Sequence, residues 1–196
     1  MRLTDYAINL LLSAILIVGA YQFYFWCQRN PLVAPRQFML RIDEWIPYWP
    51  RWVWIYSCVY YPIILYLNFV IASAREFTYV ATSYMLLLGL QMLFFVVLPV
   101  TTPRHWRAYN RGRTLSERLL ALVQRIDAPT NSFPSMHVSV AMLTAMHLLP
   151  HVGAAAFTFP ALIALSCLFT KQHYVVDLPA GAVLGWWSFA AYQTLL

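Results

Sequence analysis

The feature that most constrains this chain is a series of long apolar stretches without charged side chains. Residues 7–26, 52–72 and 77–99 contain no Lys, Arg, Asp or Glu. Each is close to the roughly 20 apolar residues that a helix needs to cross a bilayer. Hydrophobic residues make up 61% of the chain and charged residues only 10%, a balance typical of integral membrane proteins rather than soluble domains. The sequence therefore predicts an all-α integral membrane protein.

Two further stretches complete a predicted bundle of six membrane-spanning helices. Residues 138–170 also lack these charges, but Pro150 and Gly153 interrupt them, which favours two spans joined by a tight turn. The last stretch carries Gly181 and Gly185 at the spacing that lets helices approach closely, within the fold or between protomers. We therefore expect one domain over residues 1–196, with spans at residues 5–26, 52–73, 77–99, 136–150, 154–171 and 176–195.

The two long connections, residues 27–51 and 101–133, are predicted to lie at the membrane surface. The first combines four prolines with tryptophans and a tyrosine, a composition suited to the headgroup zone. The second holds six arginines against only Glu117 and Asp127. Within it, Thr114 and Glu117 form a capping-box pattern at the start of an apolar helical face. This pattern predicts a short amphipathic helix.

Charge and cysteine content narrow the expected partners. The formal net charge is +6, but the basic residues lie in loops next to the predicted spans. We therefore expect membrane lipids and a phosphorylated lipid as partners, and no nucleic acid. The three cysteines are scattered and favour neither a disulfide framework nor a zinc site. His147 and His151 have the spacing of a helical metal pair, but Pro150 lies between them and no third ligand is near, so no metal site is expected there.

The alternation of six spans would bring several polar segments to one face of the membrane. These are the arginine-rich loop, the start of the fourth span and the segment that precedes the sixth. Ionisable groups beside apolar spans are tolerated mostly where they pair or line a functional cavity, which predicts an active site. Arginines can bind a phosphate there. One histidine can attack phosphorus while the other donates a proton, and Asp177 can orient the attacking ring.

Two segments resemble motifs of the type 2 phosphatidic acid phosphatase superfamily of membrane lipid phosphatases and phosphotransferases. Residues 134–137 are Pro-Ser-Met-His, where the family has Pro-Ser-Gly-His, and residues 166–177 keep the family's serine, histidine and aspartate. The resemblance implies a lipid or polyprenyl phosphate or diphosphate as substrate, and chemistry that requires neither metal nor cofactor. The roles it implies are nucleophile for His173, its partner for Asp177, general acid for His137 and phosphate ligand for Ser135.

The sequence departs from the family pattern at the expected phosphate ligands. The first family motif is reduced to Arg104, which we take as a candidate phosphate ligand. Cys167 stands where the third motif has arginine, and Lys171 is the candidate replacement because it would lie one helical turn further along the same face. These departures, and the residues around His173, are similar to the branch that contains inositol phosphorylceramide and sphingomyelin synthases. Transfer to an alcohol is therefore an alternative to hydrolysis.

Three functions stay open at this point. The first is a membrane phosphatase that forms a phosphohistidine, and the second is a phosphotransferase that moves a phospho-headgroup to a lipid or sugar alcohol. The third is a small transporter or assembly factor whose buried histidines relay protons. We expect location in the cell membrane. The excess of Lys and Arg places the site in the cytoplasm, whereas the resemblance places it outside; the lipid and the oligomeric state are not specified.

Overall fold

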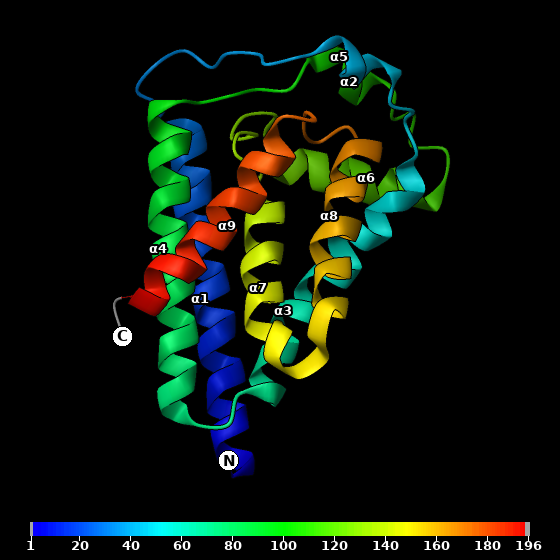
Figure 1. Cartoon of the computed structure of the whole chain (residues 1–196). Coiled ribbons are helices and arrows are strands. Elements are labelled where there is room, and N and C mark those ends of the chain that lie inside the picture. The colour runs from blue at the N-terminus through cyan, green and yellow to red at the C-terminus, as the bar shows by residue number, and fades with distance from the viewer. Residues whose placement is uncertain (1, 195–196) are drawn as a thin grey trace.

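Every regular element of the computed structural model, which describes residues 2–194, is helical (Figure 1). Within this range the only β-type contact is an isolated bridge between Arg36 and Val100. The expected all-α class is confirmed. The α-helices are α1 (Leu3–Arg29), α2 (Arg41–Trp45), α3 (Tyr60–Val70), α4 (Ala74–Val97), α5 (Arg104–Ala108), α6 (Leu115–Ile126), α7 (Met136–Val152), α8 (Thr158–Phe169) and α9 (Asp177–Thr194).

Four helical segments are long and apolar enough to cross a membrane, namely Leu3–Arg29, Pro50–Val70, Ala74–Val97 and Met136–Phe169. This number does not confirm the six predicted spans. The last segment turns back at Gly153, whose φ is 60°, so that α7 and α8 run antiparallel (Figure 1). The other missing span is α9, which is less apolar because it begins at an aspartate and includes polar residues near its end.

Local hydrogen bonds explain where two of the helices begin. Ser73 Oγ accepts a hydrogen bond from Glu76 N (3.1 Å), so α4 begins three residues before the predicted span. The predicted capping box of α6 is present, because Thr114 Oγ1 accepts from Glu117 N (3.2 Å) and Glu117 Oε2 accepts from Thr114 N (2.9 Å). A turn of π-helix over Trp54–Val59, which was not predicted, precedes α3.

The two glycines of α9 bring this helix against α7. A Cβ atom on Gly181 would lie 2.5 Å from the carbonyl oxygen of Ser135, and one on Gly185 would overlap the carbonyl oxygen of Ser139. Only glycine permits this approach. The glycine pair therefore serves packing within the fold.

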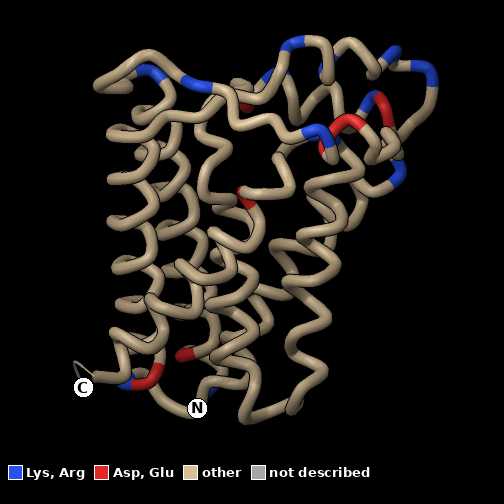
Figure 2. Tube along the Cα trace, turned by 45° about the horizontal axis from the view of Figure 1, so that its top comes forward, with Lys and Arg blue, Asp and Glu red and all other residues tan. Residues whose placement is uncertain are grey.

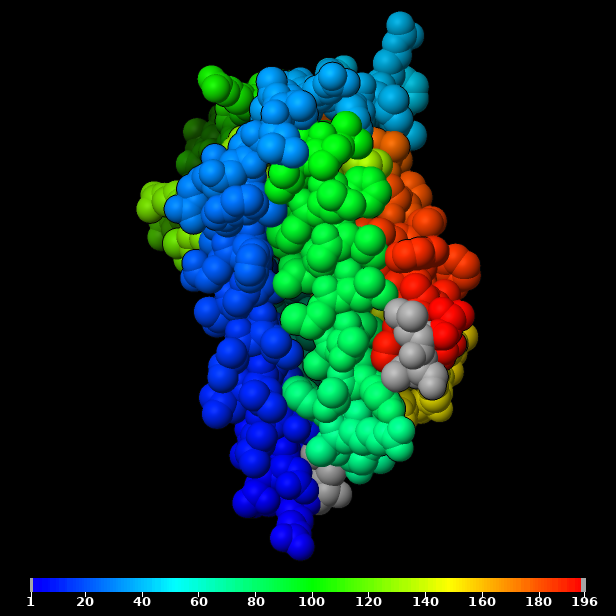
Figure 3. Space-filling view, turned by 90° about the vertical axis from the view of Figure 1, so that its left-hand side faces the viewer, coloured from blue at the N-terminus to red at the C-terminus, as the bar shows by residue number. Residues whose placement is uncertain are grey.

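One end of the bundle collects both the long connections and the positive charge. The connections that hold α2, α5 and α6 lie at this end together with the start of α7 and the segment before α9 (Figure 1). Lys and Arg residues gather here, and few lie at the opposite end (Figure 2). On the side of the bundle, α1 and α4 lie next to each other along their length (Figure 3). The structure thus has a basic end, defined by these connections, and an apolar body.

Candidate active site

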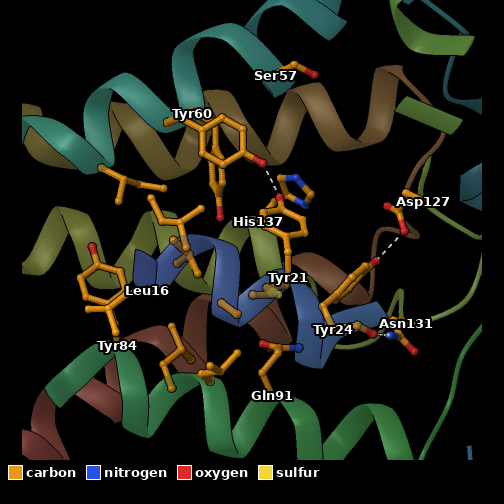
Figure 4. A pocket seen from close by; sticks show the side chains of 18 of the residues that line it. Leu16, Tyr21, Tyr24, Ser57, Tyr60, Tyr84, Gln91, Asp127, Asn131 and His137 are labelled. Atoms are coloured by element: carbon orange, nitrogen blue, oxygen red, sulfur yellow. Dashed lines mark hydrogen bonds between the residues drawn. The ribbon is translucent and has the colours of Figure 1, made fainter. Parts of the chain in front are cut away.

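A cavity of about 480 Å³ lies among α1, α3, α4 and α7. Its polar end is formed by the segment 127–132 together with Gln172 and His173, and its other end reaches Ile71 and Phe77. Most side chains along it are aromatic or aliphatic (Figure 4). The 14 residues that separate Phe77 from Gln91 on α4 correspond to ~21 Å at the rise of a helix. The cavity is therefore long and apolar, with one polar end.

His173 lines the polar end, and its hydrogen bonds define which ring nitrogen carries the proton. Nδ1 lies 2.9 Å from the carbonyl oxygen of Ser132 and 3.3 Å from Asp177 Oδ2. A carbonyl oxygen can only accept, so Nδ1 is the donor. In the neutral ring, Nε2 then carries a free lone pair, as a nucleophile requires.

His137 lies in the first turn of α7 and lines the same cavity. Its ring stacks on that of Tyr56 with centroids 4.2 Å apart, and Nδ1 lies 3.3 Å from the Tyr56 hydroxyl. The ring centroids of His137 and His173 are 6.1 Å apart. When Tyr56 donates to Nδ1, Nε2 of His137 carries a hydrogen and can donate it. The structure thus brings the two predicted catalytic histidines together.

Asp177 and Ser135 lie behind the histidines and do not line the cavity. Both are fully buried. Asp177 Oδ2 accepts hydrogen bonds from the backbone of Tyr174 (2.9 Å) and from His173, which holds the imidazole in place. Ser135 N donates to the carbonyl oxygen of Asp177 (3.0 Å), and its Oγ accepts from Val138 N (3.4 Å). In this structure Ser135 joins the starts of α7 and α9 and caps α7.

Lys171 does not occupy the position that the helical spacing predicts. Lys171 would share a face with Cys167 only in a continuous helix, but α8 ends at Phe169 and Lys171 has a φ of 58°. Its Nζ donates to the carbonyl oxygen of Asp43 (2.5 Å) and lies 4.9 Å from the ring centre of Trp106. Burial lowers the pKa of Lys171, although the nearby acidic side chains oppose this shift. Cys167, at the place of the family arginine, is buried in an apolar cluster.

Of the arginines in the loop 101–133, Arg107 lines the cavity and Arg104 does not. Arg104 is the first residue of α5 and is exposed. One turn later, Arg107 donates through Nη1 to the carbonyl oxygen of Gln124 and through Nη2 to that of Asp127, each at 2.7 Å. Burial lowers the pKa of Arg107, opposed by the charge of Asp127. Its remaining N–H groups are available to a ligand.

Asp127 is a carboxylate of the cavity that motif reasoning missed. Its Oδ1 accepts hydrogen bonds from the Tyr24 hydroxyl (2.8 Å) and from Gln28 Nε2 (2.6 Å), and Figure 4 shows the first of these. Burial raises the pKa of Asp127, while these hydrogen bonds and the charges of Arg107 and His173 oppose the rise. Its position in the sequence could have indicated this role, because Asp127 is the first acidic residue after a basic amphipathic helix and lies five residues before Ser132.

The other sequence-based candidates lie apart from the cavity. His147 Nε2 lies 2.8 Å from Ser83 Oγ, and His151 is exposed at the far end of α7.

Backbone hydrogen bonds hold the segment 127–132 at the site. They run from Thr102 N to the carbonyl oxygen of Pro129 (2.9 Å) and from Ser132 N to that of Val100 (3.1 Å). These bonds fix the carbonyl group that orients His173.

The fold and the site define a class: an all-α protein with membrane-length apolar helices that holds two histidines and a histidine-bound aspartate at the end of a cavity. The chain belongs to the PAP2 superfamily, whose family model matches residues 34–191. Membership confirms the expected superfamily and suggests an enzyme of the phosphatase or phosphotransferase type, and it fits a membrane protein. No curated protein and no solved structure matches the chain significantly.

Proposed function

We propose that the protein is a membrane-embedded phosphatase that hydrolyses a lipid or polyprenyl phosphate or diphosphate through a phosphohistidine. The observation that carries this proposal is the tautomer of His173. The Ser132 carbonyl oxygen and Asp177 both face Nδ1, which leaves the Nε2 lone pair for attack in a cavity shared with His137.

The first half of the reaction transfers the phosphoryl group to His173. Nε2 attacks phosphorus, and the N–P bond forms as the bond from phosphorus to the leaving oxygen breaks. The leaving oxygen keeps that electron pair and takes the proton of His137. The imidazole becomes positively charged, and Asp177, 3.3 Å from Nδ1, stabilises that charge.

The second half returns the enzyme to its starting state. A water molecule attacks phosphorus and gives a proton to His137. The N–P bond breaks, and its electron pair returns to Nε2 of His173. His137 therefore acts first as an acid and then as a base, as microscopic reversibility requires for one group between two oxygens.

The shape of the cavity supports a lipid as the substrate. Its polar end holds both histidines, whereas its apolar length suits a hydrocarbon chain. We also infer six membrane crossings. The run Met136–Phe169 folds into two antiparallel helices, and α9 leads back from the basic end into the bundle (Figure 1).

The test measures free phosphate and covalently bound phosphate in one preparation. Purified protein is incubated with ³²P-labelled phosphatidate or polyprenyl diphosphate, as wild type, His173→Ala and His151→Ala. We expect wild type and the exposed-site control His151→Ala to release phosphate and to retain acid-labile label, and His173→Ala to do neither. Vanadate, which imitates pentacoordinate phosphorus, should inhibit release. Turnover that survives His173→Ala would contradict the mechanism, and no turnover of any lipid phosphate would favour a non-enzymatic role.

A further inference from the structure

Three buried polar atoms at the polar end of the cavity have no partner in the part of the chain that the structure describes. They are Thr130 Oγ1, Asn131 Oδ1 and Ser132 Oγ. All three residues line the cavity, and Asn131 is only 2% exposed. The Asn131 amide has a fixed orientation, because its Nδ2 donates to the carbonyl oxygen of Tyr24 (3.2 Å). Buried polar atoms are normally satisfied by protein, water or ligand, so these three indicate an occupant.

Two charged side chains lie on the same wall of the cavity, and each has hydrogen-bonding groups that are not used by other described residues. Asp127 Oδ1 already accepts two hydrogen bonds, but Oδ2 receives none from residues 2–194. Arg107 uses two of its N–H groups on backbone oxygens of residues 124 and 127. The wall therefore offers a carboxylate oxygen and an amide oxygen as acceptors, and a guanidinium and a hydroxyl as donors.

This set of groups fits a polyhydroxylated alcohol better than it fits the other components of the reaction. A hydrocarbon tail would leave all four groups unsatisfied, which is costly at a buried site. A phosphate group alone would place its negative charge against the Asp127 carboxylate. Hydroxyl groups both donate and accept, so one polyol can use the two acceptors and the two donors at the same time.

We propose that Arg107, Asp127, Thr130 and Asn131 form a binding site for a small polyhydroxylated alcohol that receives the phosphoryl group from His173. The inference rests on the proposed phosphohistidine mechanism and names a further reaction of the same site. The four residues are hereafter the alcohol subsite. It adjoins the nucleophile directly, because Ser132, which orients His173, follows Asn131 in the chain.

The transfer step replaces water with the alcohol. A hydroxyl oxygen of the alcohol attacks the phosphorus of phosphohistidine-173, and the new O–P bond forms as the Nε2–P bond breaks. The electron pair of that bond returns to Nε2, and the hydroxyl proton goes to His137. Asp127 and Asn131 accept hydrogen bonds from other hydroxyl groups of the same alcohol. A monohydric alcohol lacks those groups and loses these bonds.

The experiment measures how the phosphoenzyme divides between water and alcohol. Full-length protein is supplied with ³²P-labelled phosphatidate in the presence of glycerol or 1-propanol, which have the same number of carbon atoms. Labelled phosphate and labelled alkyl phosphate are quantified together. At equal alcohol concentration, we expect the ratio of transfer to hydrolysis for wild type to be roughly tenfold or more higher with glycerol than with 1-propanol. The reason is that the loss of one hydrogen bond to a charged group lowers binding by about this factor.

Two variants and one matched control test the subsite. Asp127→Asn should lower the glycerol ratio about tenfold. Thr130→Val keeps the side-chain shape and removes a hydroxyl that has no protein partner, so it should fold normally and also lower the ratio. Asp5→Asn makes the same chemical change at the N-terminal start of α1, where Asp5 Oδ2 accepts from Arg2 N, and should leave the ratio unchanged.

The outcomes separate this inference from the proposed function. Release of phosphate that depends on His173, with equal ratios for glycerol and 1-propanol and no response to Asp127→Asn or Thr130→Val, would refute the alcohol subsite alone. That result would mean that the unpartnered atoms only hold water. Absence of labelled phosphoenzyme would refute the phosphohistidine mechanism itself. A glycerol preference that both subsite variants reduce would support the inference.

Discussion

Replacement of Gly181 by alanine should lower catalysis by displacing Asp177, although Gly181 does not line the cavity. The new Cβ atom would lie 2.5 Å from the carbonyl oxygen of Ser135, whereas ordinary contact begins at 3.4 Å. The starts of α7 and α9 must therefore separate by about 0.9 Å at this point. Asp177 begins α9, and its carbonyl oxygen accepts from Ser135 N at the start of α7 (3.0 Å), so the same movement stretches this bond to about 3.9 Å, beyond hydrogen-bond range, and displaces Asp177 from its place behind the histidines.

The expected effect on catalysis follows from that displacement. A shift of about 1 Å in a catalytic group can lower the rate about 100-fold, and the overpacking should lower the free energy of unfolding by about 1–3 kcal/mol. We expect kcat for phosphate release to fall about 100-fold, with a smaller change in KM because the cavity wall is intact. Phosphate release in detergent and thermal unfolding followed by intrinsic fluorescence provide the two measurements.

Two other glycines provide matched controls for this experiment. A Cβ atom on Gly19 or Gly89 would meet no atom within 4 Å. Alanine at either position should leave kcat unchanged and stabilise the helix by about 0.5–1 kcal/mol. If Gly181→Ala is folded and retains the wild-type kcat, the close approach of α9 to α7 does not set the position of Asp177, and the reasoning above is wrong.

Three further results are expected. His137→Ala should lower kcat about 10²- to 10⁴-fold in a rapid-quench assay while labelled phosphoenzyme still forms from a substrate with a good leaving group; loss of labelling with that substrate would assign attack to His137 instead. Asp127 has a raised pKa in the folded protein, so wild type should gain stability relative to Asp127→Asn as pH falls from 7 towards about 4. If the melting temperatures of wild type and Asp127→Asn differ by the same amount throughout this range, the pKa of Asp127 is not raised by its environment. Lys171→Met should lower the melting temperature by removing the bond to Asp43, with KM for phosphatidate changed less than about twofold; a tenfold rise in KM would show that Lys171 binds phosphate after all.

The sequence predicted the helical class and the meeting of both histidines because these depend on strong, local signals. Long uncharged stretches define helices in a bilayer with little ambiguity. The spacing of four between His173 and Asp177 suggested a pair, although His173 lies in the turn before α9 and only Asp177, the first residue of α9, belongs to the helix. The number of spans was harder to judge, because α8 has only 12 residues and α9 begins with a charged one.

The positions of the expected phosphate ligands were harder to predict, because they depend on where helices end. Lys171 would follow Cys167 on one face only if α8 continued past Phe169, and it does not. Arg104 and Arg107 differ by three residues on a helix of five, and only packing against α6 decides which one lines the cavity. Asp127 belongs to no motif, and its location depends on contacts with α1 about 100 residues away.

On one side of the cavity the wall is the single helix α1, and this affects which lipids the protein can distinguish. Only Asn9, Tyr24 and Cys27 are buried along its 27 residues, so the tail of the proposed lipid substrate would be separated from the surrounding bilayer by a single helix. The tail passes from one hydrocarbon medium into another, and this exchange carries little hydrophobic free energy. Lipids that differ in chain length should therefore partition into the protein almost equally. Discrimination among membrane lipids then falls to the few polar groups at the basic end.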